Sequence, residues 1–180
     1  MASYAILERA RHIQVLALDV DGILSDGRLI FGNSGEEIKA FDVRDGLGMK
    51  LVQECDVKIV IITGRTSNIV KQRMDSLGVD LVVQGREDKG IALAEACRQL
   101  NVLPTDCAYM GDDWPDLGAL AMAGLAVTVP NAHHEVRRRA HLVTQASGGR
   151  GAVRELCDVI LHAKGQYDTM LERFLAVRGA

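Results

Sequence analysis

Six short aliphatic runs alternate with helical patterns along the chain. The runs cover residues 13–18, 57–62, 81–83, 107–110, 125–129 and 141–143. Their apolar character is continuous, which is typical of strands buried on both faces of a sheet. The helical patterns lie at residues 46–54, 67–77, 90–100, 116–121, 133–138 and 151–163. This alternation predicts an α/β fold of the Rossmann-like, doubly wound type, in which helices cover both faces of a parallel sheet.

Two segments depart from the alternation. Residues 27–41 hold two short strand-like runs around the turn-rich Gly32-Asn33-Ser34-Gly35, which predicts a β-hairpin flap. Residues 165–180 predict a helical tail whose apolar stripe packs on its own domain or on another subunit. The stripe consists of Tyr167, Met170, Leu171, Phe174 and Leu175. A length of 180 residues fits a single domain, 1–180, that includes both segments.

Charge and cysteine usage limit the partners and the compartment. The formal net charge is -3, and the basic run Arg137-Arg138-Arg139 has no aromatic partners, so we interpret it as solvated helix surface. No apolar run approaches the ~20 residues of a membrane span, and residues 1–11 lack a signal-peptide pattern. Four widely spaced cysteines in apolar segments indicate reduced thiols. We expect a cytoplasmic protein that binds neither nucleic acid nor membranes.

Polar motifs follow the strand-like runs. They are Asp19-x-Asp21, Thr63-Gly64-Arg65, Lys89 at the start of a helical pattern, and Asp112-Asp113-x-x-Asp116. Each motif alone has a structural explanation as a helix cap, a turn or a surface lysine. Ligands bind outside the carboxyl ends of parallel strands, however, and all four motifs are expected at that edge. Their joint occurrence favours an active site.

Phosphoryl transfer requires these groups. A phosphate monoester repels an anionic nucleophile until a metal ion and a fixed cation offset the charge. Asp19 and Asp112, with a backbone carbonyl at Asp21, offer hard oxygen ligands for Mg²⁺, and Lys89 supplies the cation. The Thr63 hydroxyl can hold phosphoryl oxygens. We expect Asp19 to form an aspartyl-phosphate, while Asp21 protonates the leaving alkoxide and then activates water.

The motif set resembles that of the haloacid dehalogenase superfamily of phosphohydrolases over nearly the whole chain. The resemblance implies that Asp19 is the nucleophile, that Asp21 is the acid and base, and that Asp19, Asp21 and Asp112 form the Mg²⁺ site. Receiver domains of two-component signalling also combine an aspartate, a threonine and a lysine. They place an acidic pair first, whereas here the acidic pair comes last, which argues against a receiver.

Further phrases narrow the resemblance to the capless phosphatases that act on 3-deoxy-D-manno-octulosonate 8-phosphate in lipopolysaccharide synthesis. The phrases lie at residues 41–48, 62–65 and 147–155, with Arg73 in addition. The interval between Asp21 and Thr63 has room for a hairpin and one helix but not for a cap domain. The resemblance implies a homotetramer. The substrate contacts that it implies are Asp21, Asp42, Val43, Arg44, Asp45, Gly46, Arg65, Arg73 and Lys89. The long helical extension after Gln166 departs from the family pattern.

Two alternatives stay open. The motifs do not separate an octulosonate 8-phosphate from a related acidic sugar such as a nonulosonate 9-phosphate. A non-catalytic regulatory homologue would keep the fold alone, and its mark would be a missing nucleophile, lysine or metal carboxylate. None of these is missing here.

Overall fold

A six-stranded parallel sheet forms the centre of the molecule in the order β5-β4-β1-β6-β7-β8. The structure is a computed structural model that describes residues 3–176. The strands are β1 (Val15–Leu18), β4 (Lys58–Ile62), β5 (Leu81–Val83), β6 (Cys107–Met110), β7 (Leu125–Thr128) and β8 (Leu142–Val143). Each lies inside one predicted run, and all residues of β1, β6 and β7 are buried. The predicted parallel α/β fold is confirmed.

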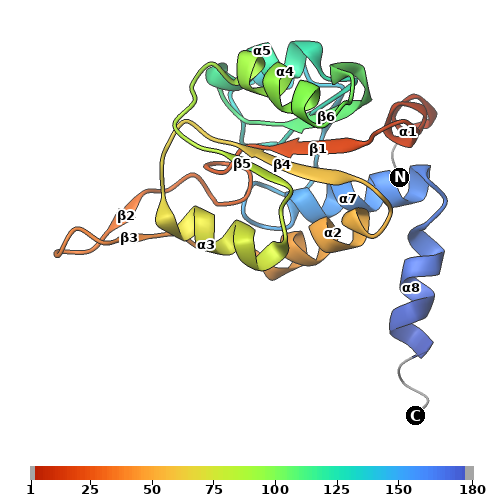
Figure 1. Cartoon of the computed structure of the whole chain (residues 1–180), viewed down its shortest axis with the longest axis horizontal. Helices are drawn as coiled ribbons and strands as arrows, with labels where there is room; N and C mark the ends of the chain where they lie inside the picture. The colour runs from red at the N-terminus through yellow and green to blue at the C-terminus, as the bar shows by residue number, and fades with distance from the viewer. Residues whose placement is uncertain (1–2, 177–180) are drawn as a thin grey trace.

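Helices cover both faces of this sheet (Figure 1). α4 (Lys89–Gln99) and α5 (Leu117–Met122) lie on one face, and α2 (Val43–Gln53), α3 (Asn68–Leu77) and α7 (Ala152–Ala163) lie on the other. The remaining helical elements are α1 (Tyr4–Arg11), α6 (His134–Arg137), α8 (Tyr167–Ala176) and two short 3₁₀ turns, Pro104–Asp106 and Trp114–Asp116. Sequence analysis does not predict α1, because Ile6 and Ala10 are its only buried residues and make a weak apolar stripe.

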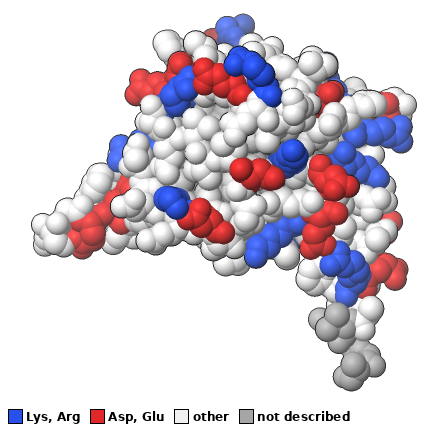
Figure 2. Space-filling view, viewed as in Figure 1, with Lys and Arg blue, Asp and Glu red and all other residues white. Residues whose placement is uncertain are grey.

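The predicted flap is a two-stranded antiparallel hairpin, β2 (Ile30–Phe31) and β3 (Glu37–Ile38), that projects from the body (Figure 1). Apart from this hairpin, α2 is the one regular element between β1 and β4, so no cap domain is inserted there, as predicted. The hairpin leaves Leu29, Ile30, Phe31 and Ile38 exposed. On the face seen in Figure 2, its tip is largely uncharged, and basic and acidic side chains elsewhere are interspersed.

The tail helix α8 leaves the body beside α7 (Figure 1). Met170 is buried, whereas Leu171, Phe174 and Leu175 are exposed. Residues 177–180 of the predicted tail lie outside the described residues, and the domain boundaries 1–180 and 165–180 stay predictions. None of the helices that the structure describes has the length and apolar composition needed to traverse a bilayer.

Candidate active site

The carboxyl ends of the central strands bring four buried polar side chains to one edge of the sheet. Asp19 follows β1 and is 5% exposed, Thr63 follows β4, Lys89 opens α4, and Asp116 ends the 3₁₀ turn after β6. The Lys89 ammonium lies 2.9 Å from Asp19 Oδ1 and donates a hydrogen bond of 2.7 Å to Asp116 Oδ1. The backbone continues the sheet at this point, since the Asp19 N–H donates to the Met110 carbonyl. The edge predicted from the sequence therefore carries a buried lysine between two carboxylates.

Asp116 orders the loop that follows β6. Its Oδ1 also accepts a 2.7 Å hydrogen bond from the Tyr109 hydroxyl, and its Oδ2 accepts the N–H groups of Asp112 and Asp113 at 3.0 and 3.1 Å. A side chain at Gly111 would place its Cβ 2.2 Å from Asp116 Cγ, so the close approach requires glycine. Sequence analysis includes Asp116 in the motif but assigns it no role. Here it fixes the backbone that presents Asp112.

Asp19, Asp112 and Asp116 form a cluster whose carboxylate oxygens lie within 4.8 Å of one another. Burial raises the pKa of Asp19 to about 7; Asp116 also raises it, and Lys89 lowers it. Burial, followed by the charge of Asp116, raises the pKa of Asp112 to about 7. Ionising these buried carboxylates is therefore costly with Lys89 as the one cation that pairs with the cluster in the described part of the chain. Hard carboxylate oxygens with excess negative charge fit Mg²⁺.

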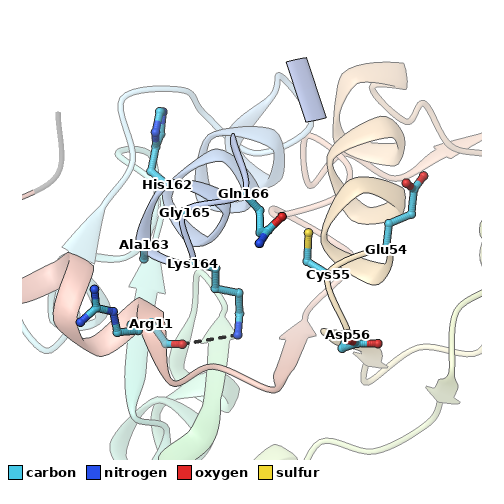
Figure 3. A pocket seen from close by; sticks show the side chains of 9 residues that line it. All are labelled: Arg11, Glu54, Cys55, Asp56, His162, Ala163, Lys164, Gly165 and Gln166. Carbon is cyan, nitrogen blue, oxygen red and sulfur yellow. Dashed lines mark hydrogen bonds between the residues drawn. The ribbon is translucent and has the colours of Figure 1, made fainter. Parts of the chain in front are cut away.

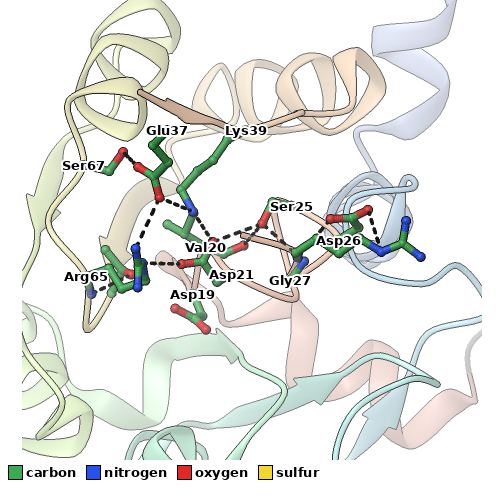
Figure 4. A network of polar contacts seen from close by, with 12 residues as sticks. Asp19, Val20, Asp21, Ser25, Asp26, Gly27, Glu37, Lys39, Arg65 and Ser67 are labelled. Atoms are coloured by element: carbon green, nitrogen blue, oxygen red, sulfur yellow. Dashed lines mark hydrogen bonds and ion pairs between the residues drawn. The ribbon is translucent and has the colours of Figure 1, made fainter. Parts of the chain in front are cut away.

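Asp21 faces a different environment from Asp19. Its Oδ1 contacts the Lys39 ammonium and accepts a 3.3 Å hydrogen bond from the Ser25 hydroxyl, and its Oδ2 lies 3.8 Å from Arg65 Nε (Figure 4). The side chain is therefore turned toward the hairpin, away from the carboxylate cluster. Any contribution to the predicted metal site would come from its backbone carbonyl, as sequence analysis assumes.

Glu37, Lys39 and Ser67 join Asp21 and Arg65 in one polar network, and sequence analysis missed all three (Figure 4). Glu37 Oε2 accepts a 2.7 Å hydrogen bond from Ser67, and Glu37 Oε1 lies 3.3 Å from Lys39 Nζ and 3.5 Å from Arg65 Nη2. The spacing of Glu37 and Lys39 could have indicated that the two side chains lie together, because residues i and i+2 of a strand point to the same face. The surrounding run looked like an ordinary exposed hairpin.

Thr63 is buried at the end of β4, beside β1, and its hydroxyl accepts the Arg65 N–H at 3.4 Å. The other predicted substrate residues gather at the start of α2. Asp42 caps this helix through a 2.8 Å hydrogen bond from the Arg44 N–H, and the Arg44 guanidinium lies 2.6 Å from Asp42 Oδ2. Val43, between them, is exposed.

Asp45 and Gly46 connect this helix start to other elements. Asp45 is buried, accepts the Arg154 N–H at 2.7 Å, and has its pKa raised to about 6 by burial. Arg73 from α3 crosses Gly46, since a Cβ there would lie 2.4 Å from Arg73 Nη2. Within residues 3–176, no hydrogen bond or ion pair links residues 42–46 to Asp19 or Asp21. The structure thus separates the predicted site into a carboxylate cluster around Asp19 and a second group around α2.

A polar pocket lies at the opposite edge of the sheet (Figure 3). The residues that line it are Arg11, Glu54, Cys55, Asp56, His162, Ala163, Lys164, Gly165 and Gln166. Arg11 and Asp56 precede β1 and β4, so this pocket opens at the amino ends of the strands. It is separate from the carboxylate cluster.

Comparison with known proteins shows which family the chain resembles. A sequence model of the haloacid dehalogenase-like hydrolases matches residues 82–156. The chain is 44% identical to the 3-deoxy-D-manno-octulosonate 8-phosphate phosphatase KdsC of Escherichia coli (strain K12) over 163 residues, which is 91% of this chain and 87% of the relative. The resemblance inferred from the motifs is confirmed.

Solved structures agree with the sequence relatives. The 3-deoxy-D-manno-octulosonate 8-phosphate phosphatase from Moraxella catarrhalis, in complex with magnesium, phosphate and KDO, superposes with a TM-score of 0.94 at 42% identity, covering 96% of this chain and 99% of that one. The corresponding Yersinia pestis phosphatase gives a TM-score of 0.91 at 42% identity, covering 93% of this chain and 90% of that one.

Proposed function

The chain belongs to the haloacid dehalogenase-like hydrolases, and we propose that it is a Mg²⁺-dependent phosphatase that hydrolyses 3-deoxy-D-manno-octulosonate 8-phosphate. The products are the free sugar acid and inorganic phosphate, and the reaction belongs to lipopolysaccharide sugar biosynthesis. The observation that carries this proposal is the position of Asp19, which is buried next to Lys89 and the Asp112 and Asp116 carboxylates. The similarity to a phosphatase solved with magnesium, phosphate and KDO supports the choice of substrate.

The reaction proceeds in two steps on the chain's own residues. An Asp19 oxygen attacks the phosphorus atom, the bond to the sugar oxygen breaks, and Asp21 gives a proton to that oxygen. Water then attacks the phosphorus of the aspartyl-phosphate, Asp21 takes the proton of the water, and Asp19 is released. Lys89 holds the attacking carboxylate and offsets its charge. The Asp19 and Asp112 carboxylates and the Asp21 carbonyl would hold Mg²⁺, which would supply Lewis-acid neutralisation of the phosphoryl charge.

Substrate recognition is assigned to groups around this centre. The Thr63 hydroxyl holds a phosphoryl oxygen. The Arg65 guanidinium lies 3.8 Å from Asp21 Oδ2 and is therefore at the ester end of the substrate, whereas Arg73, which crosses Gly46 at the start of α2, suits the carboxylate at the far end. The start of α2, residues 42–46, where Val43 and Arg44 are exposed, completes the contacts. Because this segment has no direct link to Asp19 within the described chain, we assign it to the sugar end of the substrate, on the same or a neighbouring subunit.

The assembly that we propose is a cytoplasmic homotetramer. The site has no cap domain, so neighbouring subunits are the available cover against water. The hairpin supports this view, because it exposes Phe31 by 58% together with Leu29, Ile30 and Ile38, and its strands pair only with each other. The exposed Leu171, Phe174 and Leu175 of α8 offer a second apolar surface. The four free cysteines support a reducing compartment.

The test is phosphate release with added Mg²⁺ across a panel of sugar phosphates. We expect the highest kcat/KM for the octulosonate 8-phosphate, and the Asp19→Asn variant should release no phosphate while keeping its circular dichroism spectrum and its oligomeric state. A higher kcat/KM for a nonulosonate 9-phosphate would assign the enzyme to the related sugar acid. Absence of turnover on every ester would favour a non-catalytic homologue, and normal turnover by Asp19→Asn would refute the assignment of the nucleophile.

A further inference from the structure

The Lys39 ammonium is buried although the hairpin that carries it is exposed. The Lys39 side chain is 1% exposed, and it lies against Asp21 Oδ1 and 3.3 Å from Glu37 Oε1 (Figure 4). A buried ammonium is costly unless it is paired with carboxylates. The pairing therefore accounts for the position of Lys39, and it brings the end of the hairpin onto Asp21.

The network around Lys39 balances its own charge. The carboxylates of Asp21 and Glu37 alternate with the cations of Lys39 and Arg65, and Ser67 holds the far oxygen of Glu37 at 2.7 Å. The Ser67 hydrogen bond, and then Lys39, keep the pKa of Glu37 below its ordinary value, so Glu37 stays ionised. Its Oε1 is buried with no hydrogen-bond partner among the described residues and faces the two cations. Glu37 thus acts as the counter-charge that keeps Lys39 in place.

The two oxygens of Asp21 are not equivalent in this arrangement. Oδ1 receives the Lys39 ammonium and the Ser25 hydroxyl at 3.3 Å. Among residues 3–176, the group that faces Oδ2 is the Arg65 guanidinium at 3.8 Å, which is beyond hydrogen-bond distance. Because Lys39 and Ser25 approach Oδ1, Oδ2 is the oxygen that is left open toward the reacting atoms.

We propose that Lys39 is a positioning residue that clamps Asp21 through Oδ1 and so makes Oδ2 the oxygen that transfers protons. This inference rests on the proposed phosphatase function. In the first step the Oδ2–H bond breaks and the proton passes to the ester oxygen, which takes the electron pair of its broken bond to phosphorus. In the second step Oδ2 takes a proton from the water whose oxygen bonds to phosphorus, while the bond between phosphorus and the Asp19 oxygen breaks and leaves its electron pair on the Asp19 carboxylate. Lys39 touches neither reacting atom and acts through Asp21.

The first test compares two leaving groups in Lys39→Met. Single-turnover cleavage of the sugar phosphate, whose alkoxide needs a proton, should slow by about 100-fold or more, with little change in KM. The first burst of p-nitrophenol from p-nitrophenyl phosphate should change by less than about threefold, because that leaving group needs no general acid. Lys39→Arg should restore most of the rate, and Lys58→Met, at the exposed start of β4 on the opposite edge, is the matched control.

Equal slowing of both substrates, or no slowing of either, would overturn the proposal, because a merely structural lysine would not discriminate between leaving groups. A second comparison holds even if Lys39→Met does not fold. The Asp21→Asn/Lys39→Met double variant removes both members of the pair, and its rate should equal that of Asp21→Asn alone. A further loss in the double variant would show that Lys39 acts elsewhere. The sugar phosphate in both comparisons is whichever one the wild type hydrolyses, so a wrong substrate assignment is visible separately in the wild-type panel.

Discussion

Mg²⁺ should bind the Asp19 and Asp112 carboxylates much more tightly as the pH rises from about 5.5 to about 7.5. Burial and the charge of Asp116 raise the pKa of each carboxyl from 3.8 to about 7. Near the lower pH both groups are therefore protonated in the metal-free protein. A carboxylate coordinates Mg²⁺ in its ionised form, so binding has to release these protons.

The size of the effect follows from the two pKa values. For one carboxyl with a pKa of about 7, the ionised fraction rises by about 25-fold between the two pH values. The gain in affinity is therefore about 25-fold if Mg²⁺ binding releases one proton and about 600-fold if it releases two. The same shifts destabilise the metal-free protein as the pH rises from about 4 to about 7, since the unfolded chain has already lost protons that the folded state retains.

The assay can use the single tryptophan of the chain. Trp114 is 61% exposed, lies two residues after Asp112, and is fixed by a 2.9 Å hydrogen bond from its indole N–H to His133 Nδ1. Its fluorescence should report Mg²⁺ titrations at each pH, and calorimetry in buffers of different ionisation enthalpy should count the protons released. Asp112→Asn should release about one proton fewer than the wild type. An Mg²⁺ affinity that stays constant between the two pH values would refute the reasoning.

Three further outcomes follow from contacts in the structure. Lys89→Met should lower kcat by at least about 100-fold, yet bind Mg²⁺ at least as tightly as the wild type, because the competing cation is gone; weaker binding in the same titration would contradict this. Gly148→Ala should lower the free energy of unfolding by about 1–3 kcal/mol in denaturant titrations, because its Cβ would lie 1.7 Å from the Gly22 carbonyl oxygen. The control Gly118→Ala makes ordinary contacts of 3.5 Å and should change it by less than about 1 kcal/mol. Light scattering should report the proposed tetramer for the wild type and a smaller species for Phe31→Glu, and a stable, fully active monomer would remove the case for cover by neighbours.

The sheet and the edge that carries the site could be predicted because both depend on local pattern. A run such as 57–62 is apolar throughout, since β4 is covered on both faces, and parallel topology then places the residue after each strand at a common edge. Thr63 and Lys89 were located in this way, although each alone had an ordinary structural explanation. The α1 helix was not predicted, because Ile6 and Ala10 are its only two buried residues.

The network around Asp21 could not be predicted in the same way, because its contacts join residues that are far apart in the sequence. Glu37 and Ser67 are 30 residues apart, and Lys39 and Asp21 are 18 apart. No local pattern in the hairpin's sequence predicts that one end of the hairpin is buried against the loop after β1. The role of Asp116 could not be predicted either. In a sequence motif, a carboxylate that orders a backbone loop cannot be told apart from one that binds a metal.

The negative charge of the carboxylates is balanced differently on the two sides of the site, and this difference leads to a last prediction. Around Asp19, three clustered carboxylates face Lys89, so that side is balanced only when a divalent cation is bound. Around Asp21, two carboxylates face Lys39 and Arg65, so that side is balanced by the chain itself. Removing Mg²⁺ with a chelator should therefore speed amide hydrogen exchange in the loop at residues 111–116 but leave exchange at residues 37–39 unchanged. Loosening of the hairpin to the same extent as the loop would mean that the clamp on Asp21 depends on the metal, and that Asp21 is not held independently of it.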